Sequence, residues 1–141
     1  MERTTRIPVT VSLEIQRSDG EKQETEKIAG PGYFYEADGI RFLVYETGEG
    51  LRQQIELWPE KAIVRTPVEN AGAENCMVFR MGERLAAEYH TPYGSLHMET
   101  RTREYRTEAR EEFRVWLTYE LYLDGGFVSE CRMQITAKRR S

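Results

Sequence analysis

Apolar and polar residues alternate one by one over several long stretches of the chain. In Ile7 to Arg17, the odd positions up to 15 are apolar and the even positions from 10 onward are polar. Phe113 to Leu123 and Phe127 to Ala137 show the same alternation. A period of two places successive side chains on opposite faces of a β-strand. Each of these stretches is therefore predicted to be a strand with one buried and one solvated face.

Turn-forming residues separate the alternating stretches at short intervals. Asp-Gly pairs occur at 19–20, 38–39 and 124–125, and Gly82 lies between Met81 and Glu83. These residues tolerate the positive φ that a tight hairpin requires. The spacing predicts roughly ten antiparallel strands, since strands recur near the 8–12 residues typical of sandwiches and barrels. Gly30-Pro31-Gly32 is predicted to break the second strand, either as a bulge or corner or as a chain reversal. Residues 67–75 are predicted to be the one long loop, and 107–112 the only helix-compatible piece.

A sheet built from short hairpins tends to close on itself, because closure removes exposed strand edges. The predicted fold is all-β: one domain over residues 1–141, an antiparallel meander closed into an up-and-down barrel. A Greek-key sandwich is the second choice, because it requires longer connections than this sequence offers. No crossover helix is available for a parallel α/β fold.

Composition narrows the choice of partners and compartment. The net charge of −4 argues against a nucleic-acid partner. No apolar run approaches the ~18 residues of a membrane span, and no apolar signal region follows Met1, so we expect no membrane partner and a cytoplasmic location. Cys76 and Cys131 are expected to be buried free thiols, since two isolated cysteines in strand contexts seldom pair in that compartment.

One stretch carries a family resemblance. Its residues are Ala87, Tyr89, Tyr93-Gly94, Leu96, Thr100 and Thr102, and the element Gly32 to Tyr35 fits the same order, as do the first strand and the last two. With these residues the chain resembles, over nearly its whole length, the YwiB-like family of small bacterial proteins. That family is uncharacterised. The resemblance implies a calycin-type, lipocalin-like barrel, and it implies no activity and no catalytic residues.

The residues that most often carry chemistry do not form a convincing site here. His90 and His97 are seven positions apart, and metal binding usually requires three or four convergent ligands. Ser95 and His97 share a strand face, but no Gly-x-Ser-x-Gly motif surrounds the serine. The arginines between 101 and 114 alternate with glutamates, which is typical of a salt-bridged surface. We therefore expect no enzyme, no metal and no cofactor.

Hydroxyl groups among the predicted inward-facing residues suggest a binding site. The five candidates are Tyr89, Thr100, Thr102, Tyr119 and Ser129. A buried hydroxyl without a partner is costly, so these groups need one another, water or a ligand. An apolar cavity with a few hydroxyls is the usual composition of a small-molecule pocket. The sequence therefore allows a barrel that binds a small, partly apolar molecule, and equally a filled barrel that serves as an interaction or structural module.

The outer face of the penultimate strand carries two large aromatic residues. If its odd positions face inward, Arg114, Trp116 and Tyr122 point outward. Tryptophan, tyrosine and arginine dominate interface hot spots, so this face is a candidate homodimer or partner interface. The alternative is that the rings lie over arginine side chains such as Arg101 or Arg132, as isolated surface aromatics often do.

Overall fold

The computed structural model describes residues 5–46, 50–68 and 74–140, and every regular element in these ranges is a β-strand. The strands are β1 (Ile7–Ser18), β2 (Gln23–Ala37), β3 (Ile40–Glu46), β4 (Arg52–Leu57), β5 (Lys61–Pro67), β6 (Glu74–Arg80), β7 (Arg84–Thr91), β8 (Gly94–Ala109), β9 (Phe113–Leu123) and β10 (Gly126–Arg139). None of the described segments forms a helix that could cross a membrane.

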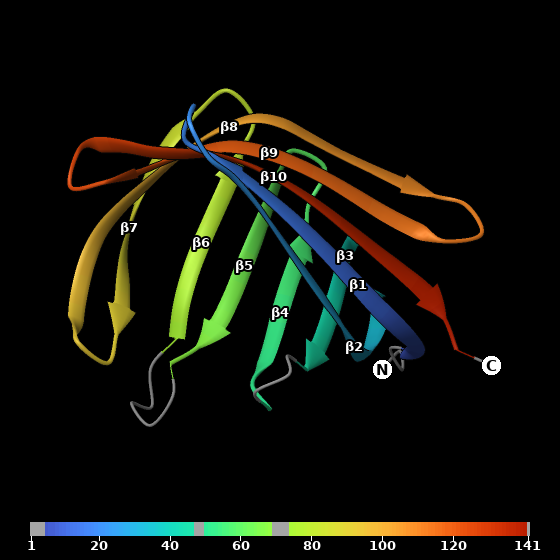
Figure 1. Ribbon diagram of the computed structural model, residues 1–141. Helices are drawn as coiled ribbons and strands as arrows, with labels where there is room; N and C mark the ends of the chain where they lie inside the picture. Colours follow the sequence, from blue (N-terminus) through green and yellow to red (C-terminus); the bar gives the residue numbers. More distant parts are fainter. Residues whose placement is uncertain (1–4, 47–49, 69–73, 141) are drawn as a thin grey trace.

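All ten strands belong to one antiparallel sheet, with the order β6-β5-β4-β3-β2-β1-β10-β9-β8-β7. Every neighbour in this order is also a neighbour in sequence, except that β1 pairs with β10 along the two ends of the chain. The sheet curls so far that β6 and β7 approach each other again (Figure 1). The predicted all-β meander of about ten strands is confirmed, as a nearly closed barrel.

The core forms where the alternating faces of the longest strands meet. Val11 in β1, Val115 in β9 and Ile135 in β10 are almost completely buried, and Leu43 and Ile55 cover them from β3 and β4. Leu13 pairs with Ile135, and Ile135 pairs with Val115, so the register places these side chains in one row. The period-two pattern therefore identified the inward face correctly in β1, in β9 and, from Ser129 onward, in β10. The inward prediction for Phe127 is wrong, because the register shifts between Phe127 and Ser129 and leaves its ring 52% exposed beside Tyr122.

The predicted interruption at Gly30-Pro31-Gly32 is wrong, because β2 continues through it. The glycines serve another purpose: β3 passes so close to β2 that a Cβ at Gly32 would lie 2.9 Å from the Cβ of Tyr45. A Cβ at either glycine would also collide with a backbone carbonyl oxygen, that of Glu46 or Val44. Glycine here permits a close backbone approach and does not end the strand.

Two other predicted segments also differ from the structure. The first half of 107–112 is strand, since β8 extends to Ala109, and the other three residues form a tight turn into β9. The predicted loop 67–75 is shorter, because β5 includes Pro67 and β6 begins at Glu74; its residues 69–73 lie outside the described residues. Both cysteines are free as predicted, but only Cys131 is buried, and Cys76 is half-buried.

A seam remains between β6 and β7. The Met81–Glu83 turn joins these strands, yet no backbone ladder connects their described residues. Among the described residues, one side chain makes hydrogen bonds across the gap: Asn75 Nδ2 donates to the carbonyl oxygen of His90 (2.9 Å), and Asn75 Oδ1 accepts from the amide of His90 (2.7 Å). The buried side-chain amide thus replaces a peptide group of the missing ladder, and the seam depends on it.

Candidate functional site

Four of the five predicted hydroxyl residues lie together on the inner face of β8, β9 and β10. Thr102 pairs with Tyr119, which also pairs with Cys131. One step along the strands, Thr100 and Ser129 both pair with Leu121. The antiparallel register therefore assembles two adjacent rows, with a hydroxyl or thiol on either side of a central β9 residue. We call the residues Thr100, Thr102, Tyr119, Ser129 and Cys131 the polar floor.

Four of the five residues of the polar floor are shielded from water, and Tyr119 is half-buried. Thr100 and Thr102 are 2% and 1% exposed, and Ser129 and Cys131 are also buried. The Ser129 hydroxyl lies 3.5 Å from the Cys131 sulfur. Burial raises the pKa of Tyr119, and the neighbouring Cys131 thiol raises it further, so this phenol stays protonated at physiological pH. Tyr119 thus adds a neutral hydrogen-bonding group to the floor.

Thr102 has an unmet hydrogen-bonding capacity. Its Oγ1 is buried and has no hydrogen-bond partner. Such a group loses its bonds to water without replacing them, which costs about 1–3 kcal/mol. The Met81–Glu83 turn holds the Thr102 backbone in place, since the Gly82 amide donates to the Thr102 carbonyl and the Thr102 amide donates to the Glu83 carbonyl. The hydroxyl therefore contributes no side-chain hydrogen bond to the fold.

The inner face next to the polar floor is only partly covered. Apolar residues that pair along β7, β8 and β9 are half-buried there: Leu85, Ala87, Met98 and Leu121. Tyr89, the fifth predicted hydroxyl residue, is also half-buried and pairs with Leu96, which is 38% exposed. It is not paired with any residue of the floor. The walls are therefore apolar and accessible, while the floor is polar.

The opposite part of the barrel is filled by its own side chains. Tyr45 is 2% exposed, its hydroxyl donates to Gln53 Oε1, and Gln53 Nε2 donates to Thr66 Oγ1 (2.9 Å). Here each polar group finds a partner on the next strand, as close packing requires. The filled alternative from the sequence thus describes the region around β3, β4 and β5, while the inward apolar residues of β7 to β9 named above are only half-buried.

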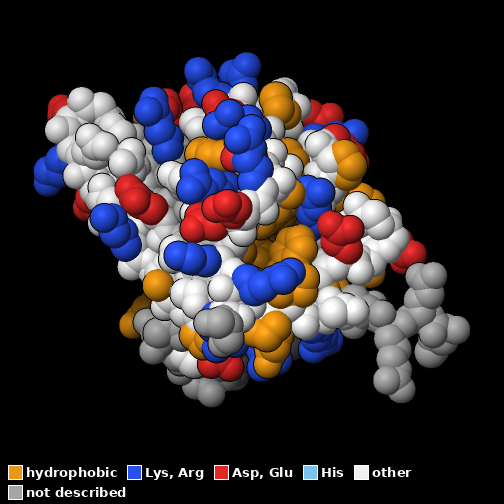
Figure 2. All heavy atoms as spheres, turned by 90° about the vertical axis from the view of Figure 1, so that its right-hand side faces the viewer, with side chains coloured by type: hydrophobic (Ala, Val, Ile, Leu, Met, Phe, Trp, Pro, Cys, Tyr) orange, Lys and Arg blue, Asp and Glu red, His pale blue; other side chains and the backbone are white. Residues whose placement is uncertain are grey.

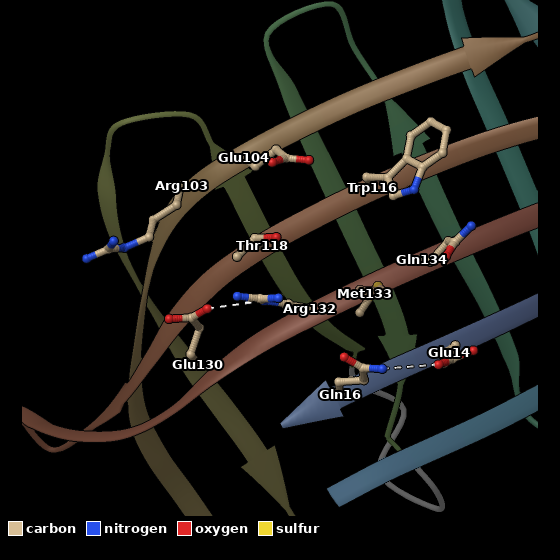
Figure 3. Close-up of a pocket in the computed structure, with 10 residues that line it drawn as sticks. All are labelled: Glu14, Gln16, Arg103, Glu104, Trp116, Thr118, Glu130, Arg132, Met133 and Gln134. Carbon is tan, nitrogen blue, oxygen red and sulfur yellow. Dashed lines mark hydrogen bonds and ion pairs between the residues drawn. The ribbon is translucent and has the colours of Figure 1, made fainter. Parts of the chain in front are cut away.

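A groove crosses the outer face of β1, β10, β9 and β8. Its volume is about 570 Å³, and Trp116 stands at one end while Glu130 and Arg132 lie at the other (Figure 3). The remaining lining residues are mostly polar: Glu14, Gln16, Arg103, Glu104, Thr118, Met133 and Gln134. Sequence reasoning placed Trp116 on this outer face correctly, but the hollow itself arises from the curvature of four strands, which no local pattern records.

The outward aromatic residues are covered by arginines of their own chain. The guanidinium carbon of Arg106 lies 4.1 Å from the centre of the Trp116 ring, and that of Arg84 lies 3.9 Å from the Tyr122 ring. The alternative in which arginines lie over these rings is therefore correct, but the arginines are Arg106 and Arg84 and not the predicted Arg101 and Arg132. Arg114, the third candidate, is exposed and pairs with Glu112 at 3.2 Å.

The histidines make only local contacts. His90 Nδ1 lies 3.0 Å from Ser95 Oγ, and His97 Nε2 lies 3.2 Å from Glu99 Oε1. Arg84 also donates to Glu99 at 2.5 Å, and this hydrogen bond is the main reason that the pKa of Glu99 is lowered. Within the described ranges, no three His, Cys, Asp or Glu side chains converge in a way that could hold a metal ion.

Charged side chains of both signs share the surface. On the face shown in Figure 2, Lys and Arg are interspersed with Asp and Glu, and hydrophobic side chains lie between them. The β8–β9 hairpin follows the same rule, since Arg103 pairs with Glu120 and Arg110 with Glu108. Exposed pairs of this kind contribute little stability, but they cancel a uniform basic field.

Fold and site together define a small antiparallel β-barrel domain with a polar floor under a partly open apolar wall. The chain belongs to the family described as "Domain of unknown function (DUF1934)", whose model matches residues 9–135. Its structure is similar to the crystal structure of the YwiB protein from Bacillus subtilis, with a TM-score of 0.84, 18% sequence identity, and coverage of 98% of this chain and 96% of that one. No curated protein matches the chain. The resemblance to the YwiB-like family is thus confirmed, and at this identity the structural match shows the fold.

Proposed function

We propose that this protein is a non-enzymatic, cytoplasmic binding protein that holds a small, partly apolar molecule against the polar floor. One observation carries the proposal: the buried Thr102 hydroxyl lacks a partner where the neighbouring inner wall is incompletely covered. A ligand with an apolar body would cover Leu85, Met98 and Leu121, and a single polar group on it would satisfy Thr102. Both contributions are favourable, since buried apolar area and a completed hydrogen bond each stabilise a complex.

Thr102→Val tests this proposal directly. Valine keeps the shape of threonine and removes only the hydroxyl, so the ligand-free variant should be as stable as the wild type or slightly more stable. Native mass spectrometry of protein purified from its own host should show a small molecule bound to the wild type. The bound fraction should fall several-fold in Thr102→Val, because a buried polar group of the ligand would then be unpaired.

Thr10→Val is the matched control, since it makes the same chemical change at an exposed position on β1. This variant should retain the ligand. If the wild type carries no small molecule, or Thr102→Val retains as much as the control, ligand binding at the polar floor is refuted.

A second candidate is self-association through the outer groove. A twofold symmetric interface must be complementary to itself. The groove offers groups that could pair across such an axis, because its lining includes the aromatic Trp116 and charges of both signs, such as Arg103 and Glu104. The stacked Arg106 reduces the apolar area that Trp116 can offer, so this candidate has less support than the polar floor.

Trp116→Ala separates the two candidates. If the groove is a dimer interface, sedimentation over a concentration series should show a wild-type dimer that this substitution dissociates, since a central tryptophan can contribute 2 kcal/mol or more, roughly thirtyfold in the dissociation constant. Tyr93→Ala, which removes a fully exposed aromatic ring elsewhere, should leave the dimer intact. A wild type that stays monomeric throughout excludes the homodimer.

A further inference from the structure

A second hollow lies between the β2–β3 turn, the β4–β5 turn and the C-terminal half of β8. It encloses about 310 Å³ and is lined by Glu36, Gly39, Arg41, Leu57, Trp58, Pro59, Tyr105 and Thr107. None of these residues belongs to the polar floor or to the outer groove. It is formed by segments distant in sequence, since Tyr105 and Trp58 are brought together only by the closure of the barrel.

Trp58, which lines the hollow, carries the other unpartnered polar atom of the described residues. Trp58 Nε1 is buried and has no hydrogen-bond partner. An indole N–H can only donate, so an acceptor is needed to satisfy it. Lys61 lies over the Trp58 ring, with its Nζ 4.7 Å from the ring centre. The backbone carbonyl of Trp58 accepts a hydrogen bond from the Tyr105 hydroxyl (2.6 Å). Burial raises the pKa of Tyr105 to about 12, so this donor stays protonated.

Arg41 adds a cationic donor to the same wall. Its Nε donates to Glu36 Oε1 at 3.1 Å, and its guanidinium carbon lies 5.2 Å from the centre of the Phe113 ring. No other hydrogen bond of this guanidinium is present among the described residues, so most of its five N–H groups are available. The protein therefore presents two donor-only groups next to the apolar side chains of Leu57 and Pro59.

We propose that this hollow is a binding site for a small carboxylate with a short apolar tail. The carboxylate accepts hydrogen bonds from Trp58 Nε1 and from the free edge of Arg41, and the tail packs against Leu57 and Pro59. A charge-assisted hydrogen bond of this kind is stronger than one between neutral groups. The volume lies at the lower end of the range for small-molecule pockets, which limits the ligand to a few carbons. The site is independent of any ligand at Thr102.

The indole proton of Trp58 provides a direct test. In ¹⁵N-labelled protein, Trp58 and Trp116 give the two indole N–H signals, and Trp116→Phe assigns them. Titration with hexanoate should shift the Trp58 signal downfield in a saturable way and leave that of Trp116 in place. Hexanamide at equal concentration should bind at least about tenfold more weakly, because it lacks the charge that Arg41 recognises.

Arg41→Gln should weaken hexanoate binding by a similar factor while the remaining amide signals keep their positions, which shows that the variant is folded. Arg110→Gln removes a highly exposed arginine elsewhere and should bind as the wild type does. The proposal is overturned if the Trp58 signal does not move at tens of millimolar hexanoate. It is also overturned if hexanamide or Arg41→Gln gives the same affinity, since the shift would then reflect adventitious binding.

Discussion

Gly32→Ala is expected to lower the free energy of unfolding by about 3 kcal/mol or more, because the added methyl group has no space. Its Cβ would collide with the Val44 carbonyl oxygen and lie 2.9 Å from the Tyr45 Cβ. The obstacle is backbone in a buried position of the core, so relaxation would require β2 and β3 to move apart. Urea denaturation followed by circular dichroism measures the change.

Gly126→Ala is the matched control for this prediction. Its backbone does not have a positive φ, and an added Cβ would meet its nearest atom, the Leu123 carbonyl oxygen, at 3.6 Å. The change in unfolding free energy should stay within about 0.5 kcal/mol. Equal stabilities for the two variants would show that the close approach of β2 and β3 is not required.

Asn75→Ala is expected to destabilise the barrel by about 2–3 kcal/mol and to loosen the seam between β6 and β7. The substitution removes both hydrogen bonds to His90 and leaves its amide and carbonyl groups without partners. Because no described backbone ladder joins these strands, nothing nearby replaces the lost bonds. Hydrogen exchange should accelerate strongly at the His90 amide and remain slow along the β1–β10 ladder.

Two further variants sharpen the test of the seam. Asn75→Asp keeps an acceptor for the His90 amide but loses the donor to the His90 carbonyl and buries a charge, so it should be destabilised as well. Gln134→Ala removes an exposed amide from β10 and should behave like the wild type. Unchanged exchange at His90 in Asn75→Ala would contradict the bridging role.

The local alternation of apolar and polar residues was sufficient to predict the strands and most of the residues that face inward. The alternation in Phe113 to Leu123 placed Leu117 and Tyr119 inside, since a strand that is buried on one face must repeat with a period of two. Thr100, Thr102 and Ser129 were identified as buried hydroxyls for the same reason. Gly32 was misinterpreted because a glycine needed for a close strand approach looks, in sequence, like a glycine at a turn.

Only the tertiary structure decided which of these groups meet and which lack partners. Thr102 joins Tyr119 and Cys131 through cross-strand register, and Trp58 meets Tyr105 because the barrel closes, across 47 positions in the chain. Asn75 gave no sequence signal at all, since its role exists only where β6 and β7 face each other without a ladder. The sequence by itself determined the strands, because alternation is local. The unpaired donors, the seam and the hollows depend on distances between strands, which are set by the closure and curvature of the whole sheet.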